Sequence, residues 1–362
     1  MKTSSSIPGK KRILVAVLDW GLGHAARCVP LVESLLQEGH EVILGANGRA
    51  AHLLEMEFPN LLLENLPSYR IRYFSNNMFF NIGIQSPKII SAAWREYRKL
   101  AQLIEKHQLD IVISDNRFGC FNTTIKSIFL SHQLWIKIPF RPLEIIVNRI
   151  NHWVIKQFDE CWIPDWSDEN RLAGELSRPI VGIPHRYLGI LSRMKKGPPL
   201  QKRPLVAILS GPEPKRTELE RLLIQQAQQL NKEIVIVQGK PEAKEKPIKR
   251  LSDSVQLIPA LSGVELNQLV NEASVLICRS GYSSLMDLVQ MQKQAILIPT
   301  PGQTEQEYLA QKYSSEGLFF SQPQSSFQLE QALNAIGNYP GFGAKHSTLE
   351  QEALIQEAVA SL

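Results

Sequence analysis

Short runs of consecutive apolar residues recur along the chain, and stretches with a helical period separate them. The first run covers residues 13–18 and is rich in β-branched side chains, as a strand buried on both faces of a parallel sheet should be. The apolar positions that follow recur on one helical face, namely Val29, Val32, Leu35 and Leu36. Pro30 is expected near the start of that helix and Gly39 at its end. Residues 41–45 are the next strand, so this region predicts a βαβ unit.

The same alternation continues with one interruption. Residues 50–100 are less regular, residues 110–114 are another strand that ends at Asp115, and residues 161–164 are a late strand. Residues 193–203 then hold five basic residues, no acidic residue and a Gly-Pro-Pro step, which is typical of an interdomain linker. Beyond it the pattern restarts, with strands predicted at 205–209, 234–238, 255–258, 275–278 and 295–298, and helices at 217–230, 328–336 and 349–362.

Repeated strand–helix units in both halves predict an α/β protein with two parallel sheets covered by helices. We expect an N-terminal domain over residues 11–192, a linker over 193–203 and a second domain over 204–345. Residues 346–362 are a terminal helix that can pack back on the N-terminal domain. In such folds, ligands bind beyond the carboxyl ends of the strands.

Composition narrows the class of protein without naming an activity. The chain has 362 residues, 44% of them apolar and 21% charged, which fits about two globular domains. The net charge of +5 permits an anionic ligand or an anionic membrane surface, and no basic stripe interleaved with aromatic residues points to nucleic acid. The four cysteines are scattered, which predicts buried thiols in a reducing compartment: Cys28, Cys120, Cys161 and Cys278.

No stretch of 18 or more uninterrupted apolar residues occurs, so no transmembrane helix is expected. The early apolar run at residues 13–18 is too short for a signal peptide and ends at Asp19 without a cleavage pattern. We therefore expect a cytoplasmic protein.

Two small-residue loops carry the candidate chemistry. The first follows the strand at 275–278 and reads Arg-Ser-Gly-Tyr-Ser-Ser, with Asp287 farther into the helix behind it. A turn of this kind at a helix N-terminus presents backbone N–H groups and the positive end of the helix dipole to an anion. The second loop, residues 19–24, places glycines before His24. Together the loops favour an enzyme that binds a nucleotide-sugar between two α/β domains.

The ordered cluster Arg279-Ser280-Gly281, Asp287, Pro299 and Glu305-Gln306 resembles the donor site of GT-B glycosyltransferases. The pattern is similar to the N-acetylglucosaminyltransferase that makes the lipid intermediate of peptidoglycan and to nucleotide-sugar transferases around it. The resemblance covers about residues 12–50 and 205–315. It is poor over 55–190, where acceptor recognition usually resides.

The resemblance implies a role for each matching residue. Asp287 would hold the donor ribose, Glu305 and Gln306 the donor sugar, and the backbone of Ile258 the base. The contacts to the diphosphate would come from the turn and from two glycine loops: Arg279, Ser280, Gly281, Tyr282 and Ser283; Ser210 and Gly211; Gly21 and Gly23. The Ser210 loop departs from the family pattern, because Pro212 and Pro214 remove two N–H donors.

A transferase that inverts the anomeric centre needs a general base for the acceptor hydroxyl, and histidine suits that task near neutral pH. Some GT-B enzymes orient this base with an aspartate, and Asp115 lies 91 residues after His24 at a strand end. We expect His24 as the base and Asp115 as its partner. No Asp-x-Asp motif occurs, so this interpretation requires no metal or other cofactor; helix dipole and N–H groups would stabilise the leaving diphosphate.

Each assignment has a simpler structural alternative. Ser284 and Asp287 could form a helix cap, His24 could only cap or touch phosphate, and Asp115 could cap a turn. Trp20 could stack on a ligand or only pack. The remaining histidines of interest are expected to be structural: His132, His152 and His185.

Two other functions stay open. A nucleotide-sugar 2-epimerase shares the architecture but needs further acidic residues near the sugar, and a non-catalytic protein would bind the donor without turning it over. For the acceptor, the apolar stretches 78–84 and 135–141 with their basic neighbours suit a lipid-linked hydroxyl compound at the inner membrane face, although core packing with solvated Lys and Arg is the favoured explanation of these stretches.

Overall fold

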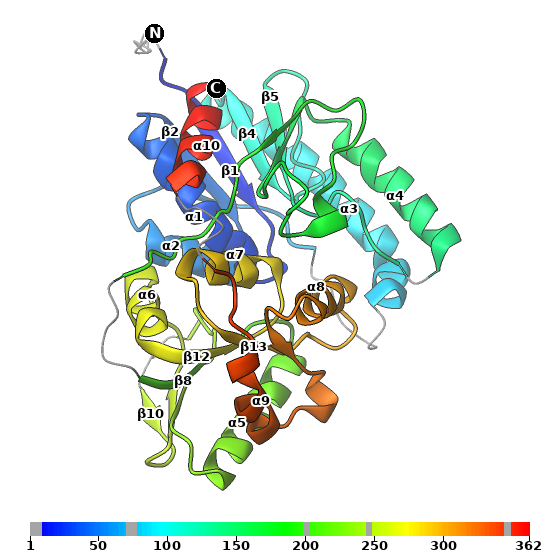
Figure 1. Cartoon of the computed structure of the whole chain (residues 1–362). Helices are drawn as coiled ribbons and strands as arrows, with labels where there is room; N and C mark the ends of the chain where they lie inside the picture. The colour runs from blue at the N-terminus through cyan, green and yellow to red at the C-terminus, as the bar shows by residue number, and fades with distance from the viewer. Residues whose placement is uncertain (1–8, 70–77, 139, 198–202, 244–247, 344–348) are drawn as a thin grey trace.

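The computed structural model describes residues 9–69, 78–138, 140–197, 203–243, 248–343 and 349–362. Within these ranges the protein consists of two α/β halves, one above the other in Figure 1, and the chain passes from the first to the second between residues 187 and 203. Both termini lie at the N-terminal half. The predicted α/β class with two parallel sheets is confirmed.

The described N-terminal half holds a parallel sheet in the order β3-β2-β1-β4-β5-β6-β7. Its strands are β1 (Arg12–Val17), β2 (Glu41–Ala46), β3 (Leu63–Asn65), β4 (Ile111–Asp115), β5 (Lys126–Leu130), β6 (Glu160–Ile163) and β7 (His185–Tyr187). Its helices are α1 (Leu22–Gln37), α2 (Gly48–Glu57), α3 (Met78–His107), α4 (Arg141–Ile155) and the short η1 (Gly174–Ser177).

The described C-terminal half repeats the plan in the order β10-β11-β9-β8-β12-β13-β14, parallel except where β10 meets β11. Its strands are β8 (Arg203–Ile208), β9 (Ile234–Val237), β10 (Lys249–Arg250), β11 (Val255–Ile258), β12 (Ala273–Cys278), β13 (Ala295–Leu297) and β14 (Phe320–Ser321). Its helices are α5 (Lys215–Gln229), α6 (Gly263–Glu272), α7 (Tyr282–Met291), α8 (Thr304–Ser315), η2 (Gln324–Ser326), α9 (Leu329–Ala335) and η3 (Ile336–Asn338). The last helix, α10 (Leu349–Ala360), follows in sequence but lies at the N-terminal half in Figure 1.

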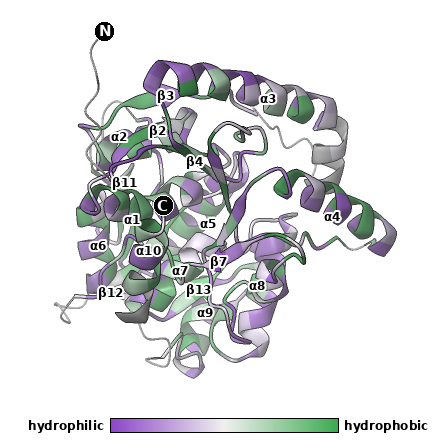
Figure 2. Cartoon of the chain, turned by 90° about the horizontal axis from the view of Figure 1, so that it is seen from above, coloured by the Kyte–Doolittle hydropathy of each residue, from purple (hydrophilic) through white to green (hydrophobic). Residues whose placement is uncertain are grey.

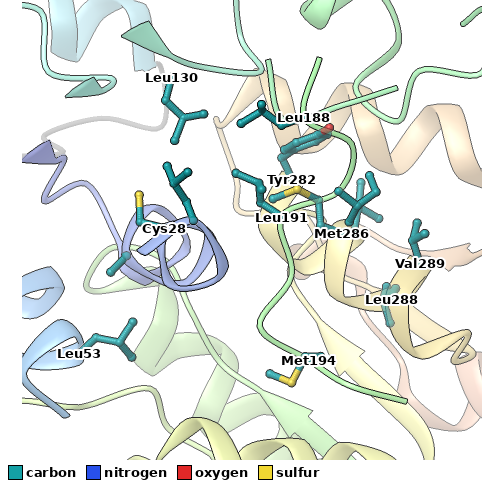
Figure 3. Close-up of a cluster of buried hydrophobic side chains, with 14 of the residues drawn as sticks. Cys28, Leu53, Leu130, Leu188, Leu191, Met194, Tyr282, Met286, Leu288 and Val289 are labelled. Carbon is teal, nitrogen blue, oxygen red and sulfur yellow. The ribbon is translucent and has the colours of Figure 1, made fainter. Parts of the chain in front are cut away.

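One apolar core runs through the contact between the halves. Its buried side chains come from α1, from the crossing segment and from α7, as the labelled side chains of Figure 3 show. In that view the segment that carries Leu188, Leu191 and Met194 passes between the two helices. The terminal helix α10 adds Ile355 and Val359 to the same core and lies against α1. Burial of this area holds the halves together, because apolar surface removed from water is the main favourable contribution to association.

The expected start of the first helix is wrong. α1 begins at Leu22, so Pro30 lies in its interior rather than near its start. An interior proline costs about 3 kcal/mol, and the complete burial of neighbours such as Leu31 and Val32 offsets this at roughly 1.5–3 kcal/mol per side chain. Leu36, predicted on the buried face, is 37% exposed.

The stretch that the pattern left irregular contains α2 and α3, and α4 follows in the region without a predicted element. All four cysteines are free and buried, as the sequence predicted.

Candidate functional site

The candidate base and its partner lie together at the carboxyl ends of β1 and β4. His24 is the third residue of α1, and Asp115 is the last residue of the adjacent strand. His24 Nδ1 lies 3.1 Å from Asp115 Oδ2. The His24 side chain is 18% exposed and Asp115 is completely buried. In such an arrangement a carboxylate can orient an imidazole through Nδ1.

A third side chain, Arg27, joins this pair one helical turn after His24. Its Nε donates to Asp115 Oδ2 at 3.2 Å, and its Nη2 contacts Asp115 Oδ1. Burial by itself would raise the pKa of the Asp115 carboxyl, but the charge of Arg27 and the contact with His24 outweigh it and hold that pKa at about 2. Asp115 is therefore an anion throughout the neutral range.

The small-residue turn after β12 has the geometry of an anion site. Gly281 is the N-cap of α7 and supplies no side-chain cap, so the first N–H groups of the helix are not capped by the preceding side chain. Ser280 Oγ donates to the carbonyl of Gln306 at 2.8 Å, and Gln306 Oε1 accepts from the N–H of Thr300 at 2.8 Å. Gln306 thus ties the turn to the loop after β13. The alternative in which Ser284 and Asp287 cap this helix is wrong, because α7 begins two residues before Ser284.

Arg279 lies beneath this turn. Its side chain is buried and donates to the carbonyls of Ile298, Pro299 and Lys215 and to Gln324 Oε1, over 2.7–3.2 Å. Burial lowers its pKa to about 10, so it remains a cation at neutral pH. Its main contacts brace the protein, and only Nε is left without a partner among the described residues.

A second buried donor shares this property with Arg279 Nε. In the described part of the chain, the buried hydroxyl of Thr300 also has no hydrogen-bond partner. Both groups border Gly211, because a Cβ placed there would lie 3.3 Å from Thr300 Oγ1 and 3.8 Å from Arg279 Nε. Gly211 has φ of +101°, a conformation that favours glycine. Buried polar groups usually find partners, so this pair beside the glycine favours an anionic ligand there.

Asp287 faces the space between the halves. Its Oδ1 accepts from Ser192 Oγ at 2.6 Å, and Ser192 belongs to the crossing segment. Burial raises the pKa of the Asp287 carboxyl to about 6, although the Ser192 hydrogen bond and the charge of Arg193 act in the opposite direction. Asp287 therefore titrates close to neutral pH.

A cavity of about 130 Å³ opens beside Asp287. Apolar side chains from both halves form most of its wall, and its polar residues include Ser210, Ser283, Ser284 and Asp287. Gly23, the neighbour of His24, lines it from the N-terminal half. An apolar slot with a few converging polar groups is the usual form of a small-molecule site.

The turn also makes direct contacts across the cleft. Ser283 Oγ donates to the carbonyl of Gly23 at 3.0 Å. Tyr282 is buried, its hydroxyl donates to the carbonyl of Pro164 at 2.6 Å, and its ring lies flat on His132 at 4.0 Å. The turn residues predicted to hold a diphosphate therefore also join the two halves.

The other predicted residues are placed as follows. Ser210 lines the cavity, whereas Ile258 lies in the core and its carbonyl accepts the N–H of Gln238 at 2.8 Å. Ala260 and Leu261, just beyond Ile258, line the cavity instead. Trp20 packs edge-on against Tyr69 at 5.9 Å between ring centres.

Sequence reasoning missed two residues, Arg27 and Ser192, and expected His132 to be only structural. His132 does more than fill the core, because it contacts Arg27 at 2.9 Å and Glu305 at 3.1 Å. A signal existed, since His132 follows β5 as Asp115 ends β4, and parallel strand ends meet at one edge of a sheet. His152 and His185 contact backbone carbonyls, of Leu134 and Ile183 respectively, as structural histidines do.

Two family descriptions match the chain. Residues 11–131 match glycosyl transferase family 1, and residues 214–352 match the glycosyltransferase family 28 C-terminal domain. A Methanosarcina mazei protein described as an uncharacterized glycosyltransferase is 22% identical over 327 residues, which are 84% of each chain.

Solved structures share the fold over nearly the whole length. The glycotransferase of kitacinnamycin superimposes with a TM-score of 0.62 at 13% identity, covering 98% of this chain and 96% of the other. MurG from Acinetobacter baumannii superimposes with a TM-score of 0.55 at 13% identity, covering 96% of this chain and 98% of the other. The predicted resemblance is confirmed by these matches.

Proposed function

Because this chain belongs to the GT-B glycosyltransferases and carries a family 28 C-terminal domain, we propose that it transfers a sugar from a nucleotide-diphosphate sugar to a hydroxyl acceptor. One observation carries the proposal. A single interdomain cavity is lined by Asp287 and Ser210 from one half and by Gly23, beside the His24–Asp115 pair, from the other. The donor is a uridine diphosphate sugar with a hexosyl or N-acetylhexosaminyl group, following the family resemblance.

In this proposal each part of the cavity has one task. The apolar slot near Ala260 and Leu261 takes the base, and ionised Asp287 accepts from the ribose hydroxyls. The N-terminus of α7 and the donors around Gly211 face the diphosphate. Glu305 and Gln306 contact the sugar.

The reaction then follows from the two faces of the cleft. His24 Nε2 takes the proton of the acceptor hydroxyl while its oxygen attacks the anomeric carbon. The bond from that carbon to the diphosphate oxygen breaks, and the α7 N-terminus stabilises the charge on the departing nucleotide diphosphate. Attack opposite the leaving group inverts the anomeric centre.

The cavity is smaller than a donor requires. Drug-sized ligands occupy clefts of roughly 300–1,000 Å³, against about 130 Å³ here. We infer that the halves separate to admit the donor and break contacts such as Ser283 to Gly23.

Nucleotide binding is the first test. Thermal unfolding is measured with UDP, thymidine diphosphate, GDP and their sugar forms, for the wild type and for Asp287→Ala. A ligand that binds the native state raises its stability by mass action. We expect a rise with uridine compounds that the variant loses. A folded wild type that no nucleotide stabilises would contradict the proposal.

Product analysis separates the alternatives. Transfer to an acceptor that disappears in His24→Ala, with donor binding retained, supports the transferase and its base. Epimerised free sugar formed without acceptor would indicate the 2-epimerase instead. Binding without any turnover would indicate a non-catalytic nucleotide-sugar protein.

The surface of helix α4 is relevant to the acceptor, because polar side chains of this helix face the protein and an apolar stripe faces solvent. The side that faces the protein carries Asn148 and Asn151, which bond to the backbone of Ile136 and Leu134 at 2.8–3.0 Å. The side that faces solvent carries an apolar stripe at intervals of three and four residues, between 38% and 66% exposed: Phe140, Leu143, Ile146, Ile150 and Trp153. Globular helices normally bury such a stripe.

The neighbouring helix α3 adds Ile90 and Trp94, which are 70% and 58% exposed. Both helices lie on the outer side of the N-terminal half in Figure 2. Residues 70–77 and the side chains of 78–82 and 84, on which the sequence hypothesis partly rested, lie outside the described residues. Exposed basic side chains flank the α4 stripe, among them Arg141, Arg149 and Lys156.

We propose that this surface rests on an anionic bilayer and brings a lipid-linked acceptor to the cleft, which would place the protein at the cytoplasmic membrane face. Aromatic and aliphatic side chains with a basic border suit the interface of such a membrane. No helix among the described residues is long and apolar enough to span a bilayer.

Vesicle flotation tests the surface. Wild type should float with vesicles that contain phosphatidylglycerol and less with phosphatidylcholine alone. Ile146→Glu with Ile150→Glu should abolish flotation. Val264→Glu is the matched control, since Val264 is 82% exposed on α6 in the other half. Equal flotation of the folded double variant would refute membrane docking.

A further inference from the structure

Arg27 has a place in the site that the His24–Asp115 pair alone does not explain. Its side chain is 2% exposed, and a buried guanidinium is unfavourable unless its donors are paired. Beyond Asp115 it reaches two histidines: Nη2 lies 3.0 Å from His24 Nδ1, and Nη1 lies 2.9 Å from His132 Nδ1. Arg27 therefore sits between the candidate base and a second, buried imidazole.

The chemistry of arginine fixes the direction of the second contact. A guanidinium only donates, so His132 Nδ1 must accept, and a neutral His132 then carries its proton on Nε2. That nitrogen lies 3.1 Å from Glu305 Oε1 and donates to it. Burial lowers the pKa of His132, which agrees with a neutral ring. The result is a series of two hydrogen bonds, in which Arg27 donates to His132 and His132 donates to Glu305.

This series of hydrogen bonds crosses the cleft. Arg27 and His132 belong to the N-terminal half, whereas Glu305 is the second residue of α8 in the other half. The flat face of His132 also stacks on Tyr282, the first residue of α7, with the two ring planes 3° apart. The position of His132 is thus set by the two elements that carry the proposed donor contacts.

At the other end of this hydrogen-bond series, Arg27 affects which ring nitrogen of His24 carries the proton. Its Nδ1 lies within hydrogen-bond distance of an acceptor, Asp115 Oδ2, and of a donor, Arg27 Nη2. Only one can be satisfied at a time. The ring that donates to Asp115 leaves Nε2 free to accept a proton, whereas the ring that accepts from Arg27 carries its proton on Nε2 and is no base.

We propose that Arg27 and His132 are positioning residues that couple the His24–Asp115 pair to the docking of Glu305 and Tyr282 across the cleft. With the halves docked, His132 anchors one arm of Arg27 and keeps the guanidinium on Asp115, so His24 holds its proton on Nδ1. With the halves apart, the freed guanidinium competes for His24 Nδ1. The inference rests on the proposed transferase function, and it makes the base competent only in the closed protein.

Two other described groups near the pair, Cys28 and Tyr282, stay neutral. Cys28 Sγ lies 3.5 Å from Asp115 Oδ2, and burial raises the pKa of this thiol well above its usual value. Tyr282 is likewise held neutral, because burial raises the pKa of its hydroxyl. Arg27, His132 and Glu305 are therefore the groups whose changes should be felt at His24.

A measurement that does not depend on turnover comes first. In protein labelled with ¹⁵N-histidine, long-range ¹H–¹⁵N correlation reads which ring nitrogen carries the proton, and His24→Gln assigns the His24 signals. We expect the proton on Nδ1 of His24 and on Nε2 of His132. His132→Phe keeps a ring against Tyr282 but removes both the acceptor for Arg27 and the donor to Glu305, so the His24 proton should move toward Nε2. An unchanged His24, or a proton on Nδ1 of His132, would overturn the proposal even if transferase activity is established.

Kinetics provide the second test, on the full chain with a donor that the nucleotide panel identifies. His132→Phe should lower kcat about 10- to 100-fold and change the donor affinity less than about twofold. Arg27→Met should lower kcat and move the acidic limb of the kcat profile to higher pH, because the Asp115 charge beside His24 is no longer compensated. Arg27→Lys restores the charge and should return that limb while kcat stays low.

A packing role would give another pattern. Loss of stability with unchanged kcat and an unchanged pH profile in the folded variants would overturn the coupling. So would equal loss of kcat and donor affinity. If the wild type transfers no sugar from any donor, the proposed function fails, and the histidine spectra still decide the coupling.

Discussion

Gly23 and Ser283 are 260 residues apart in the chain, and their contact closes the cleft. The Ser283 hydroxyl donates to the Gly23 carbonyl at 3.0 Å, and a Cβ at residue 23 would lie 2.8 Å from Ser283 Oγ and 3.2 Å from its Cβ. Any larger side chain at position 23 would press on the Ser283 side chain. The close contact joins the loop beside the candidate base to the turn at the start of α7.

We expect Gly23→Ala to push the two halves apart. Overpacking costs about 1–3 kcal/mol, and it should appear as a lower melting temperature and a larger radius of gyration in solution scattering. Adding Ser283→Gly removes both atoms that the new methyl group meets and should restore the scattering profile. If the double variant stays as expanded as Gly23→Ala, strain elsewhere in the loop is responsible.

Nucleotide affinity should depend on pH through Asp287. Its carboxyl has a pKa of about 6 in the unliganded protein, and only the ionised form accepts from both ribose hydroxyls. Affinity, measured by calorimetry, should therefore strengthen as pH rises from 5 to 7 and level off above. Asp287→Asn should bind weakly and without this dependence.

Ser192→Ala is the matched variant for this titration. Its hydroxyl donates to Asp287 and lowers the pKa of that carboxyl, so its removal should move the binding midpoint to higher pH. If the midpoint of nucleotide binding does not move, another group controls the affinity.

The raised pKa of the Asp287 carboxyl also affects folding. The protonated carboxyl favours the native state, so this stability is present below about pH 4 and is lost as pH rises through 6.

Removing the Asp115 carboxylate should destabilise the protein through Arg27. Asp115→Asn leaves the buried guanidinium without its counter-ion, which costs about 3–5 kcal/mol. Urea unfolding measures this loss. Asp115→Asn combined with Arg27→Met should cost less than the sum of the two single changes, since the pair is in contact. Additive losses would show that the two side chains are independent.

Lowering the pH should reduce the difference in stability between the wild type and Asp115→Asn. The pKa of Asp115 is about 2 in the native protein and about 3.9 in an unfolded chain. The stability that it contributes is present above about pH 4 and is lost as pH falls through 2. Wild type and Asp115→Asn should therefore converge in stability toward pH 2.

Arg279→Met should disrupt the turn after β12 as a whole. It leaves three buried carbonyls and the Gln324 amide oxygen without their donor, and each such loss costs about 1–3 kcal/mol. We expect a strong loss of thermal stability together with loss of nucleotide binding. Arg221→Met, on the surface helix α5, is the control. A stable Arg279 variant that only binds nucleotide more weakly would instead indicate direct contact with the diphosphate.

Several buried strands were predicted correctly from the sequence. The buried strands are continuous apolar runs, so β1, β4, β9, β11 and β12 were predicted to within about two residues. The helices α2, α3 and α4 were missed. α4 in particular departs from the usual rule, because it buries Asn148 and Asn151 and exposes Ile146 and Ile150, and its pattern does not reveal which face meets the protein.

The sequence by itself determined the two α/β halves and the family, because strand runs and loop motifs are local and their order survives in the chain. The family resemblance also suggested the pair His24 and Asp115, and the two side chains lie 3.1 Å apart in the structure. The roles of Arg27, His132 and Ser192 were decided only by tertiary structure. Each acts through a partner 88 to 173 residues away, and no local spacing encodes which buried donor meets which acceptor across a cleft. The same holds for Arg279, whose buried side chain donates to three carbonyls and to Gln324 and leaves only Nε without a partner among the described residues.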